Sequence, residues 1–383
     1  MKRAAFFFGS GISRLSGAPT VDAITESLLE GAWRPHTDGR FYPLPSREGA
    51  LSVGVAKDAQ DFLRILKDAI DPVLEAREHR KSHYEDLYSA VLQIVQDEMW
   101  ENVNPLIAKN VELIRAATAH LHVRGHAHID DNRFASLADR VADLVQWTVS
   151  YGLRSAMRPV GIGAVSATAH AVDELDIFSL NHDLLLEAEL AAAGIDQTDG
   201  FGAQRGNVRV FDGQWDSGAK PIRLMKLHGS INWYLFRFPN WDQYAKVHGS
   251  PDDCVGDDGK RLDVLDRKPL FLTGTNVKEQ AYGIGLFGEM FGEFRKRISN
   301  HRTLICCGYG WGDKGINIRL NQWLRDAAEN RIVILHNDPD DLLWQKRFWY
   351  FRWDDLVNAG KVVVIPKWLS ECSVAELEPY FDN

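Results

Sequence analysis

Short runs of hydrophobic residues recur along the chain and are the clearest structural signal in its pattern. Each run is too brief for a typical helix, is rich in β-branched or aromatic residues, and stops abruptly at polar residues or glycine. The six runs are residues 4–8, 175–180, 222–227, 303–307, 331–335 and 362–365. Such continuous hydrophobicity is typical of strands that are covered on both faces. The pattern therefore predicts an α/β fold, a parallel sheet with helices on both faces.

Polar and glycine clusters follow five of these runs, at the point where each predicted strand ends. They are Gly9-Ser10-Gly11, Asn181-His182-Asp183, His228-Gly229, Gly308-Tyr309-Gly310 and His336-Asn337-Asp338. In an open α/β sheet the carboxyl ends of the strands form the ligand crevice. We therefore expect these five segments to converge on one edge of the sheet.

The pattern changes between about residues 28 and 164, where longer stretches have helical spacing. Residues 59–67 and 135–145 are examples. We expect a helical insertion over residues 29–164, so that the sheet domain is discontinuous and comprises residues 1–28 and 165–383. Residues 252–268 are charged and contain glycine, which predicts an exposed loop.

Composition narrows the class of protein. The chain has 383 residues, of which 45% are hydrophobic, enough for one large or two moderate domains. Its four cysteines, Cys254, Cys306, Cys307 and Cys372, form no CxxC pair, which predicts a cytoplasmic protein without disulfides or zinc. No run approaches the roughly 18 apolar residues of a membrane span. The net charge of −9 disfavours nucleic-acid binding but leaves room for a local basic groove.

The first polar cluster extends to Gly9-Ser10-Gly11-Ile12-Ser13 and precedes a predicted helix over residues 21–29. Glycines let backbone amides approach a pyrophosphate, and a helix N-terminus favours its negative charge. Arg14 stands where GxGxxG has its third glycine, and no acidic residue follows at the spacing of a ribose contact. A hydride-transferring dehydrogenase is therefore disfavoured, and a glycine turn without a ligand is the alternative.

The run from Gly9 to Pro19 resembles the sirtuin signature GAGxSxxxGxP, with Ser10 in place of the alanine. Asn181-His182-Asp183 resembles the sirtuin T-x-N-x-D segment, and His228-Gly229 resembles the H-G segment; their order along the chain agrees. The run from Gly308 to Asp313 resembles the G-Y-S-x-x-D form of bacterial sirtuin-like defence proteins. His336-Asn337 resembles the strand-end asparagine that contacts the adenosine ribose. The resemblance covers the sheet domain and implies a Rossmann-like fold that binds NAD.

The resemblance also implies roles for individual residues. Asn181 would position the nicotinamide ribose or the attacking water, Asp183 would hydrogen-bond the carboxamide, and His228 would act as base. The residues implied in NAD binding are Gly9, Ser10, Gly11, Ile12, Ser13, Pro19, Gly308, Tyr309, Gly310 and Asn337. Cleavage of the glycosidic bond builds positive charge on the ribose, and a histidine that titrates near neutrality can accept the proton. Taken singly, a strand-end His-Gly is commonly a turn and Asn-x-Asp a helix cap.

The chain departs from deacetylating sirtuins at several points. It lacks their four-cysteine zinc site, and Thr20-Val21-Asp22 replaces their Asp-Phe-Arg run after the proline. Gly310 replaces the serine of the family's segment. These departures favour water, or a hydroxyl of NAD, over acetyl-lysine as the acceptor, and we expect neither zinc nor another metal.

The resemblance thus implies an NAD hydrolase that releases nicotinamide and ADP-ribose, or a cyclised form, and depletes NAD in bacterial anti-phage defence. Such effectors act as assemblies, so we expect a homo-oligomer, with a HerA-type ATPase as a candidate partner. The alternatives are an NAD-dependent protein deacylase or ADP-ribosyltransferase, and a non-catalytic sensor of NAD or ADP-ribose. A nuclease is a weaker alternative.

Three other features of the sequence have simpler explanations than a site. Four histidines and two aspartates between His120 and Asp131 would form a metal site only if extended, and their surroundings have helical spacing. The tryptophans of the last quarter indicate a core or a protein interface. They are Trp323, Trp344, Trp349, Trp353 and Trp368. The run from Asp338 to Asp341 is typical of a turn before a helix rather than of a magnesium site.

Overall fold

The computed structural model of the chain divides into two compact units. It describes residues 1–36, 40–44, 53–99, 104–121, 133–154, 158–216, 221–239, 241–275, 278–338, 342 and 353–383. The first unit, here called the sheet unit, comprises Met1–Ala18, Leu153–Leu272 and Lys278–Asn383. The second, here called the helical unit, comprises Pro19–Gly152 and Thr273–Val277.

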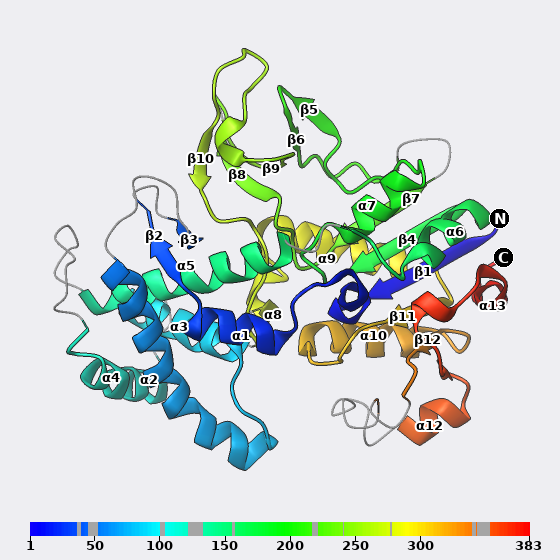
Figure 1. Cartoon of the computed structure of the whole chain (residues 1–383). Coiled ribbons are helices and arrows are strands. Elements are labelled where there is room, and N and C mark those ends of the chain that lie inside the picture. The colour runs from blue at the N-terminus through cyan, green and yellow to red at the C-terminus, as the bar shows by residue number, and fades with distance from the viewer. Residues whose placement is uncertain are drawn as a thin grey trace. The chain divides into compact units, whose positions relative to one another are not determined.

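A parallel sheet of six strands forms the centre of the sheet unit (Figure 1). Its strands are β1 (Arg3–Phe8), β4 (Glu174–Ser179), β7 (Ile222–Lys226), β11 (Thr303–Cys307), β12 (Arg331–Leu335) and β13 (Val362–Ile365). They coincide with the six hydrophobic runs, so the predicted α/β fold is confirmed. The order across the sheet is β13-β12-β11-β1-β4-β7, and all pairs are parallel. Counted along the chain this is the doubly wound order 3-2-1-4-5-6, in which the order reverses between β1 and β11.

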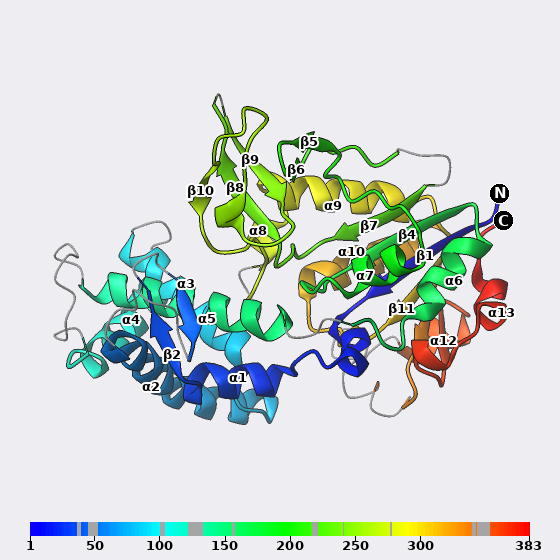
Figure 2. The ribbon, with the colours of Figure 1, turned by 45° about the horizontal axis from the view of Figure 1, so that its top comes forward.

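Both faces of this sheet are covered by helices, as the continuous hydrophobicity of the strands requires (Figure 2). Successive side chains of a strand point to opposite faces. Phe7 therefore packs under α9 (Gly285–Ile298) and α10 (Lys314–Asp326), in the core that also holds Trp323. Phe6 and Phe8 pack on the other face, under α6 (Gly163–Ala171) and α7 (Leu185–Ala192).

A second sheet of five antiparallel strands belongs to the same unit and was not anticipated from the sequence. Its order is β10-β8-β9-β6-β5. The strands are β5 (Ala203–Arg205), β6 (Val208–Val210), β8 (Trp233–Arg237), β9 (Asp242–Lys246) and β10 (Asp263–Asp266). Tyr234, Phe236 and Ala245 form its core. The expectation of a loop over residues 252–268 is therefore wrong in part, because β10 lies within it and Leu262 is buried.

The helical unit contains most of the helices of the predicted insertion. They are α1 (Val21–Glu30), α2 (Val53–Glu78), α3 (Tyr84–Glu98), α4 (Pro105–Ala117) and α5 (Arg133–Arg154). A hairpin of β2 (Trp33–Pro35) and β3 (Phe41–Pro43) accompanies them. The unit begins at Pro19 rather than at residue 29, since the buried face of α1 packs against α2 and α3. Its main stretch ends at Gly152 rather than at residue 164, and α6 packs in the sheet unit.

The remaining elements are short. They are α8 (Lys278–Ala281), α12 (Trp353–Asn358), α13 (Val374–Leu377) and the 3-10 helices Ser10–Ser16, Pro251–Asp253, Leu369–Glu371 and Glu378–Tyr380. Trp353 and Trp368 are partly buried against the two cores of the sheet unit, whereas Trp344 and Trp349 lie outside the described residues. Residues 339–341 also lie outside them. Within the described ranges, no helix is long and apolar enough to cross a membrane.

A buried histidine fastens the end of the chain to the amino edge of the parallel sheet. His301 Nε2 lies 2.8 Å from Asp176 Oδ2, and its Nδ1 lies 3.1 Å from Asp382 Oδ2. Arg223 Nη1 donates to the other oxygen of Asp176 at 3.0 Å. Burial alone would lower the pKa of His301, but the two carboxylates raise it above the ordinary value. His301 is thus held as a cation between two anions.

The stability that His301 contributes should depend on pH. Because its pKa is raised on folding, the contribution is complete below the ordinary value of 6.5 and is lost as the pH rises through the folded pKa. His301→Gln should therefore lower the free energy of unfolding most at acidic pH, and the loss should shrink at alkaline pH. Denaturant unfolding of both proteins between about pH 5 and 9 measures this. The exposed His248→Gln serves as control, and a loss that stayed constant with pH would contradict the assignment.

Candidate active site

Glycines at the carboxyl ends of β1 and β11 let two loops touch where the strand order reverses. The Gly11 N–H donates to the Gly308 carbonyl at 2.9 Å. A Cβ added to Gly9 would lie 2.5 Å from the same carbonyl oxygen. Gly308 has φ +67°, and a Cβ there would lie 2.5 Å from the Ile12 nitrogen. Contact between the two backbones therefore accounts for glycine at all three positions.

Backbone amides of this segment, which the sequence assigned to a pyrophosphate, are bonded within the protein. The Gly9 N–H donates to the Cys307 carbonyl at 3.1 Å, and the Ile12 N–H donates to the Gly9 carbonyl at 3.3 Å. With that of Gly11, three backbone donors of this segment are bonded within the protein. The side chain of Ile12 is buried in the core, while Ser10 is exposed.

The helix predicted over residues 21–29 is confirmed as α1, but the glycine loop does not lead directly into it. It enters a 3-10 helix of seven residues, Ser10–Ser16, which ends at Gly17 with φ +82°. Thr20 then caps α1, its side chain accepting the Ala23 N–H at 3.1 Å. Pro19 and α1 belong to the helical unit. The helix N-terminus beside the glycines is therefore that of the short 3-10 helix.

Three buried polar side chains connect the ends of β1 and β4. The Ser13 hydroxyl donates to Asp183 Oδ2 at 2.7 Å, and Asn181 Nδ2 donates to the Ser13 hydroxyl at 3.1 Å. Asp183 Oδ1 accepts the Leu185 N–H at 3.1 Å just before α7, whose N-cap position is held by Leu184. Asn181 Oδ1 is buried and has no hydrogen-bond partner among the described residues. It is thus a buried acceptor that the described residues leave unsatisfied.

His228 lies at the end of β7 and is held by two groups from elsewhere in the chain. Its Nε2 lies 2.8 Å from the Tyr282 hydroxyl and 3.2 Å from Asp313 Oδ2, and the tyrosine also donates to Asp313. Asp313 Oδ1 accepts the Ile316 N–H at 2.9 Å, which caps α10. A base oriented by a carboxylate is an arrangement suited to proton transfer.

The electrostatics of this group favour an ionised Asp313. Burial by itself would raise the pKa of Asp313, but hydrogen bonds from His228, Ile316 and Tyr282 lower it well below its usual range. Burial and the charge of Asp313 raise the pKa of Tyr282, so its hydroxyl remains a neutral donor. Asp313 can therefore stabilise a protonated His228.

A buried lysine joins the two parts of the site. Lys226 Nζ donates to the carbonyls of His182, at 3.4 Å, and Asp183, and to the Ser230 hydroxyl at 2.8 Å. Its charge is paired with Glu187 at 3.2 Å. The ring centroids of His182 and His228 lie 6.2 Å apart. The Asn181–Asp183 loop and His228 are therefore neighbours, fixed to one another by Lys226.

The structure thus brings Ser13, Asn181, Asp183 and His228 together, but not every residue the resemblance implied. Tyr309 is buried, and its hydroxyl donates to Asn317 Oδ1 at 2.8 Å and lies 3.1 Å from the Asp313 carbonyl, so it holds its own loop. Gly310 is exposed. Asn337 is exposed at the end of β12, two strands from β1.

Sequence reasoning missed three residues of the site. Asp313 appeared only as the last residue of a resembling segment, although its position before a helical stretch is a capping signal. Lys226 adjoins the His-Gly segment, but nothing in its spacing marks it as buried. Tyr282 gives no signal in the sequence.

Neither a metal centre nor a family match adds to this picture. Over the ranges that the structure describes, no three His, Cys, Asp or Glu side chains are grouped to hold a metal ion. Most of the histidine-rich stretch, residues 122–131, lies outside those ranges. No protein-family model and no curated protein matches the sequence.

Gly9→Ala should destabilise the protein, because the methyl group would force apart the two backbones at the end of β1 and β11. We expect the free energy of unfolding to fall by about 1–3 kcal/mol. Gly312→Ala is the matched control, since a Cβ there meets no atom within 4 Å. Equal stability of the two variants in denaturant unfolding would show that the contact is unimportant.

Lys226→Met should lower the free energy of unfolding by about 3 kcal/mol, because it leaves Glu187 with less compensation in a buried place. Lys314→Met, at an exposed ion pair with Glu279, should have little effect. Adding Glu187→Gln to Lys226→Met should restore part of the loss. Fully additive losses in this double-mutant cycle would argue against the pairing.

Proposed function

We propose that this chain hydrolyses NAD at the nicotinamide–ribose bond, releasing nicotinamide and ADP-ribose. The observation that carries the proposal is the buried Asn181, with an amide oxygen that no described residue occupies, beside a histidine oriented by an ionised carboxylate. Asn181 follows β4, which adjoins β1 at the reversal of strand order where doubly wound sheets bind their ligands, and His228 follows β7, the next strand. The resemblance of these segments to sirtuins supplies the identity of the substrate.

The side chains suit the bond changes of this reaction. The bond from ribose C1′ to the pyridine nitrogen breaks, nicotinamide leaves with the electron pair as a neutral molecule, and a water oxygen bonds to C1′. Asn181 Oδ1 accepts a hydrogen bond from that water or from a ribose hydroxyl. His228 takes up the proton that the water releases, and Asp313 stabilises the resulting imidazolium.

Asp183 receives a different role from the one that the resemblance implies. Its oxygens accept hydrogen bonds from the Ser13 hydroxyl and the Leu185 N–H. Ser13 in turn accepts from Asn181. We therefore assign Asp183 to the positioning of Asn181 through Ser13, rather than to the nicotinamide carboxamide.

The arrangement of the cysteines supports water, rather than acetyl-lysine, as the acceptor of the ADP-ribosyl group. Cys306 and Cys307 are buried on β11, and Cys372 packs against the core that holds Cys307. Cys254 lies apart, in the core of the antiparallel sheet, so the four cysteines do not meet as in the zinc module that accompanies acetyl-lysine binding in deacetylating sirtuins.

The biological setting of the proposal rests on the resemblance alone. We propose a cytoplasmic effector of bacterial anti-phage defence that acts by depleting NAD. We further propose that it works as a homo-oligomer, with a HerA-type ATPase as a candidate partner. Control by assembly has a physical sense, because an unregulated hydrolase would exhaust a shared cofactor.

Incubation of the full chain with NAD, with and without candidate partners, should release nicotinamide that chromatography detects. Asn181→Ala and His228→Ala should each lower the rate by about 10²–10⁴-fold, because they remove the positioning acceptor and the base. Asp313→Asn should lower it less, since the histidine remains. Arg325→Gln, at an exposed residue of α10, is the control.

Three results would contradict the proposed hydrolase activity. If NAD stayed intact under every assembly condition, the chain would not be a hydrolase. Tight NAD binding without turnover would indicate a sensor. Release of nicotinamide only in the presence of an acylated peptide would indicate a deacylase.

A further inference from the structure

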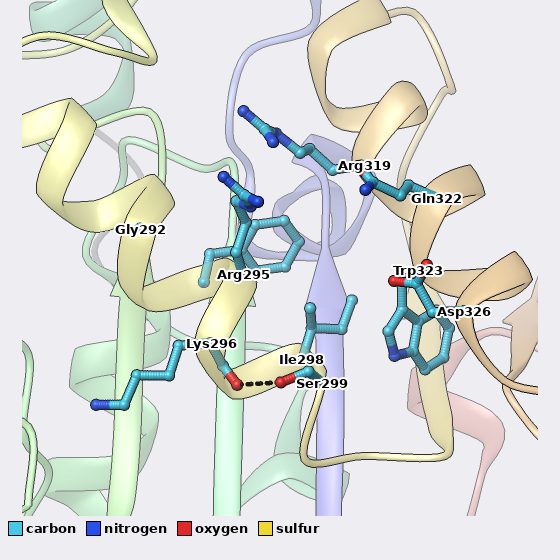
Figure 3. Close-up of a pocket in the computed structure, with 10 residues that line it drawn as sticks. Gly292, Arg295, Lys296, Ile298, Ser299, Arg319, Gln322, Trp323 and Asp326 are labelled. Atoms are coloured by element: carbon cyan, nitrogen blue, oxygen red, sulfur yellow. Dashed lines mark hydrogen bonds between the residues drawn. The ribbon is translucent and has the colours of Figure 1, made fainter.

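Two arginines converge on an open groove between α9 and α10, on the face of the parallel sheet that these helices cover. Figure 3 shows Arg295 of α9 and Arg319 of α10 pointing into the space between the helices. The groove has two hollows, of about 380 and 520 Å³, which share Gly292 and both arginines. We call this feature the α9/α10 groove. Its size is that of a small-molecule site.

The two arginines of the groove, Arg295 and Arg319, lack an ion-pair partner among the described residues. Burial and the nearby charge of Arg295 lower the pKa of Arg319, which is the mark of two like charges held close together. An anion bound between them would offset this repulsion, and guanidinium groups match the geometry of phosphate.

One side of α9 forms a floor without side chains. Gly285, Gly288 and Gly292 follow one another at spacings of three and four residues and share a face of the helix with Arg295. Glycine within a helix costs about 0.5–1 kcal/mol relative to alanine. A Cβ at Gly292 would meet no atom within 4 Å, so packing does not require glycine there. Next to the arginines the floor is therefore open at Gly292, whereas at Gly288 a Cβ would lie 2.9 Å from the backbone of Gly283.

A buried donor lies on the other side of the groove. Trp323 of α10 lines the first hollow and is 3% exposed. Its Nε1–H has no hydrogen-bond partner in the part of the chain that the structure describes. An unpaired buried donor is uncommon in proteins and indicates a group or a water that completes it.

We propose that the α9/α10 groove is a second binding site, which takes a nucleoside phosphate with its phosphates between Arg295 and Arg319 and its base on the glycine face of α9. A compact anion fits better than a nucleic-acid strand, because acidic side chains bound the positive zone. Asp326 lines the first hollow and Glu289 the second. The net charge of −9 agrees with this choice.

Tyr282 connects the groove to the candidate active site. It lines the second hollow, and its hydroxyl bonds to His228 and Asp313. A nucleotide in the groove would contact the residue that orients the base, so its binding should change the rate of NAD cleavage. This consequence rests on the proposed function, whereas the binding itself does not.

Calorimetry with ADP and with inorganic phosphate tests the site in the full chain. Asn181→Ala serves as background, so that binding is measured without cleavage. ADP should bind, and Arg295→Gln with Arg319→Gln should weaken it at least tenfold, while Arg325→Gln should not. Gly292→Leu fills the floor without strain on the helix. It should weaken the binding of ADP but leave the binding of inorganic phosphate unchanged. Thermal melting confirms that each variant is folded.

Several results would overturn the proposal. One is the absence of ADP binding, and another is an equal affinity for ADP in the wild-type chain and the double variant. A third is that an oligonucleotide or an acidic peptide binds through the two arginines while ADP does not bind. For the coupling, ADP should change nicotinamide release in the wild-type chain but not in the double variant. An effect that persists in the double variant would place ADP at the active site and refute the coupling.

Discussion

The close approach of two backbones at the reversal of strand order is the constraint on which the candidate site depends. Gly9, Gly11 and Gly308 let the loops after β1 and β11 touch without side chains between them. This contact fixes where the chain leaves β1, and so places Ser13 beside the loop that follows β4. In many doubly wound proteins such glycines make room for a phosphate. Here they first make room for another segment of the same chain.

Buried charges hold the rest of the site in register, and each is compensated. Lys226 fastens the loop after β4 to the segment after β7, and its ammonium is opposed by Glu187. The buried histidines His301 and His228 both contact carboxylates, but they have different roles. His301 faces a carboxylate at each ring nitrogen, which makes it a structural cation. His228 faces one carboxylate and a neutral hydroxyl at a single nitrogen, an arrangement that suits a group whose proton must move.

The sequence predicted the parallel sheet well, because continuous hydrophobic runs are required of strands buried on both faces. It also placed Asn181, Asp183 and His228 at strand ends, where the topology brings them together. The antiparallel sheet escaped notice because its strands have three to five residues, too few for a clear alternation. Tyr282 and Lys226 could not be found from the sequence, since their roles arise from contacts with residues far along the chain. The boundary at residue 28 was misplaced because the amphipathic pattern of α1 does not tell which unit its apolar face joins.

The two faces of α9 differ in sequence, and folding explains only one of them. Leu286, Met290 and Phe294 form the buried face that packs on the parallel sheet. The opposite face holds glycines and then Arg295, a choice that helix propensity disfavours. At Gly288 packing explains it, because a Cβ would lie 2.9 Å from the backbone of Gly283. At Gly292 neither propensity nor packing gives a reason for glycine. The remaining difference from alanine is the open floor that glycine leaves beneath two arginines without an ion-pair partner among the described residues.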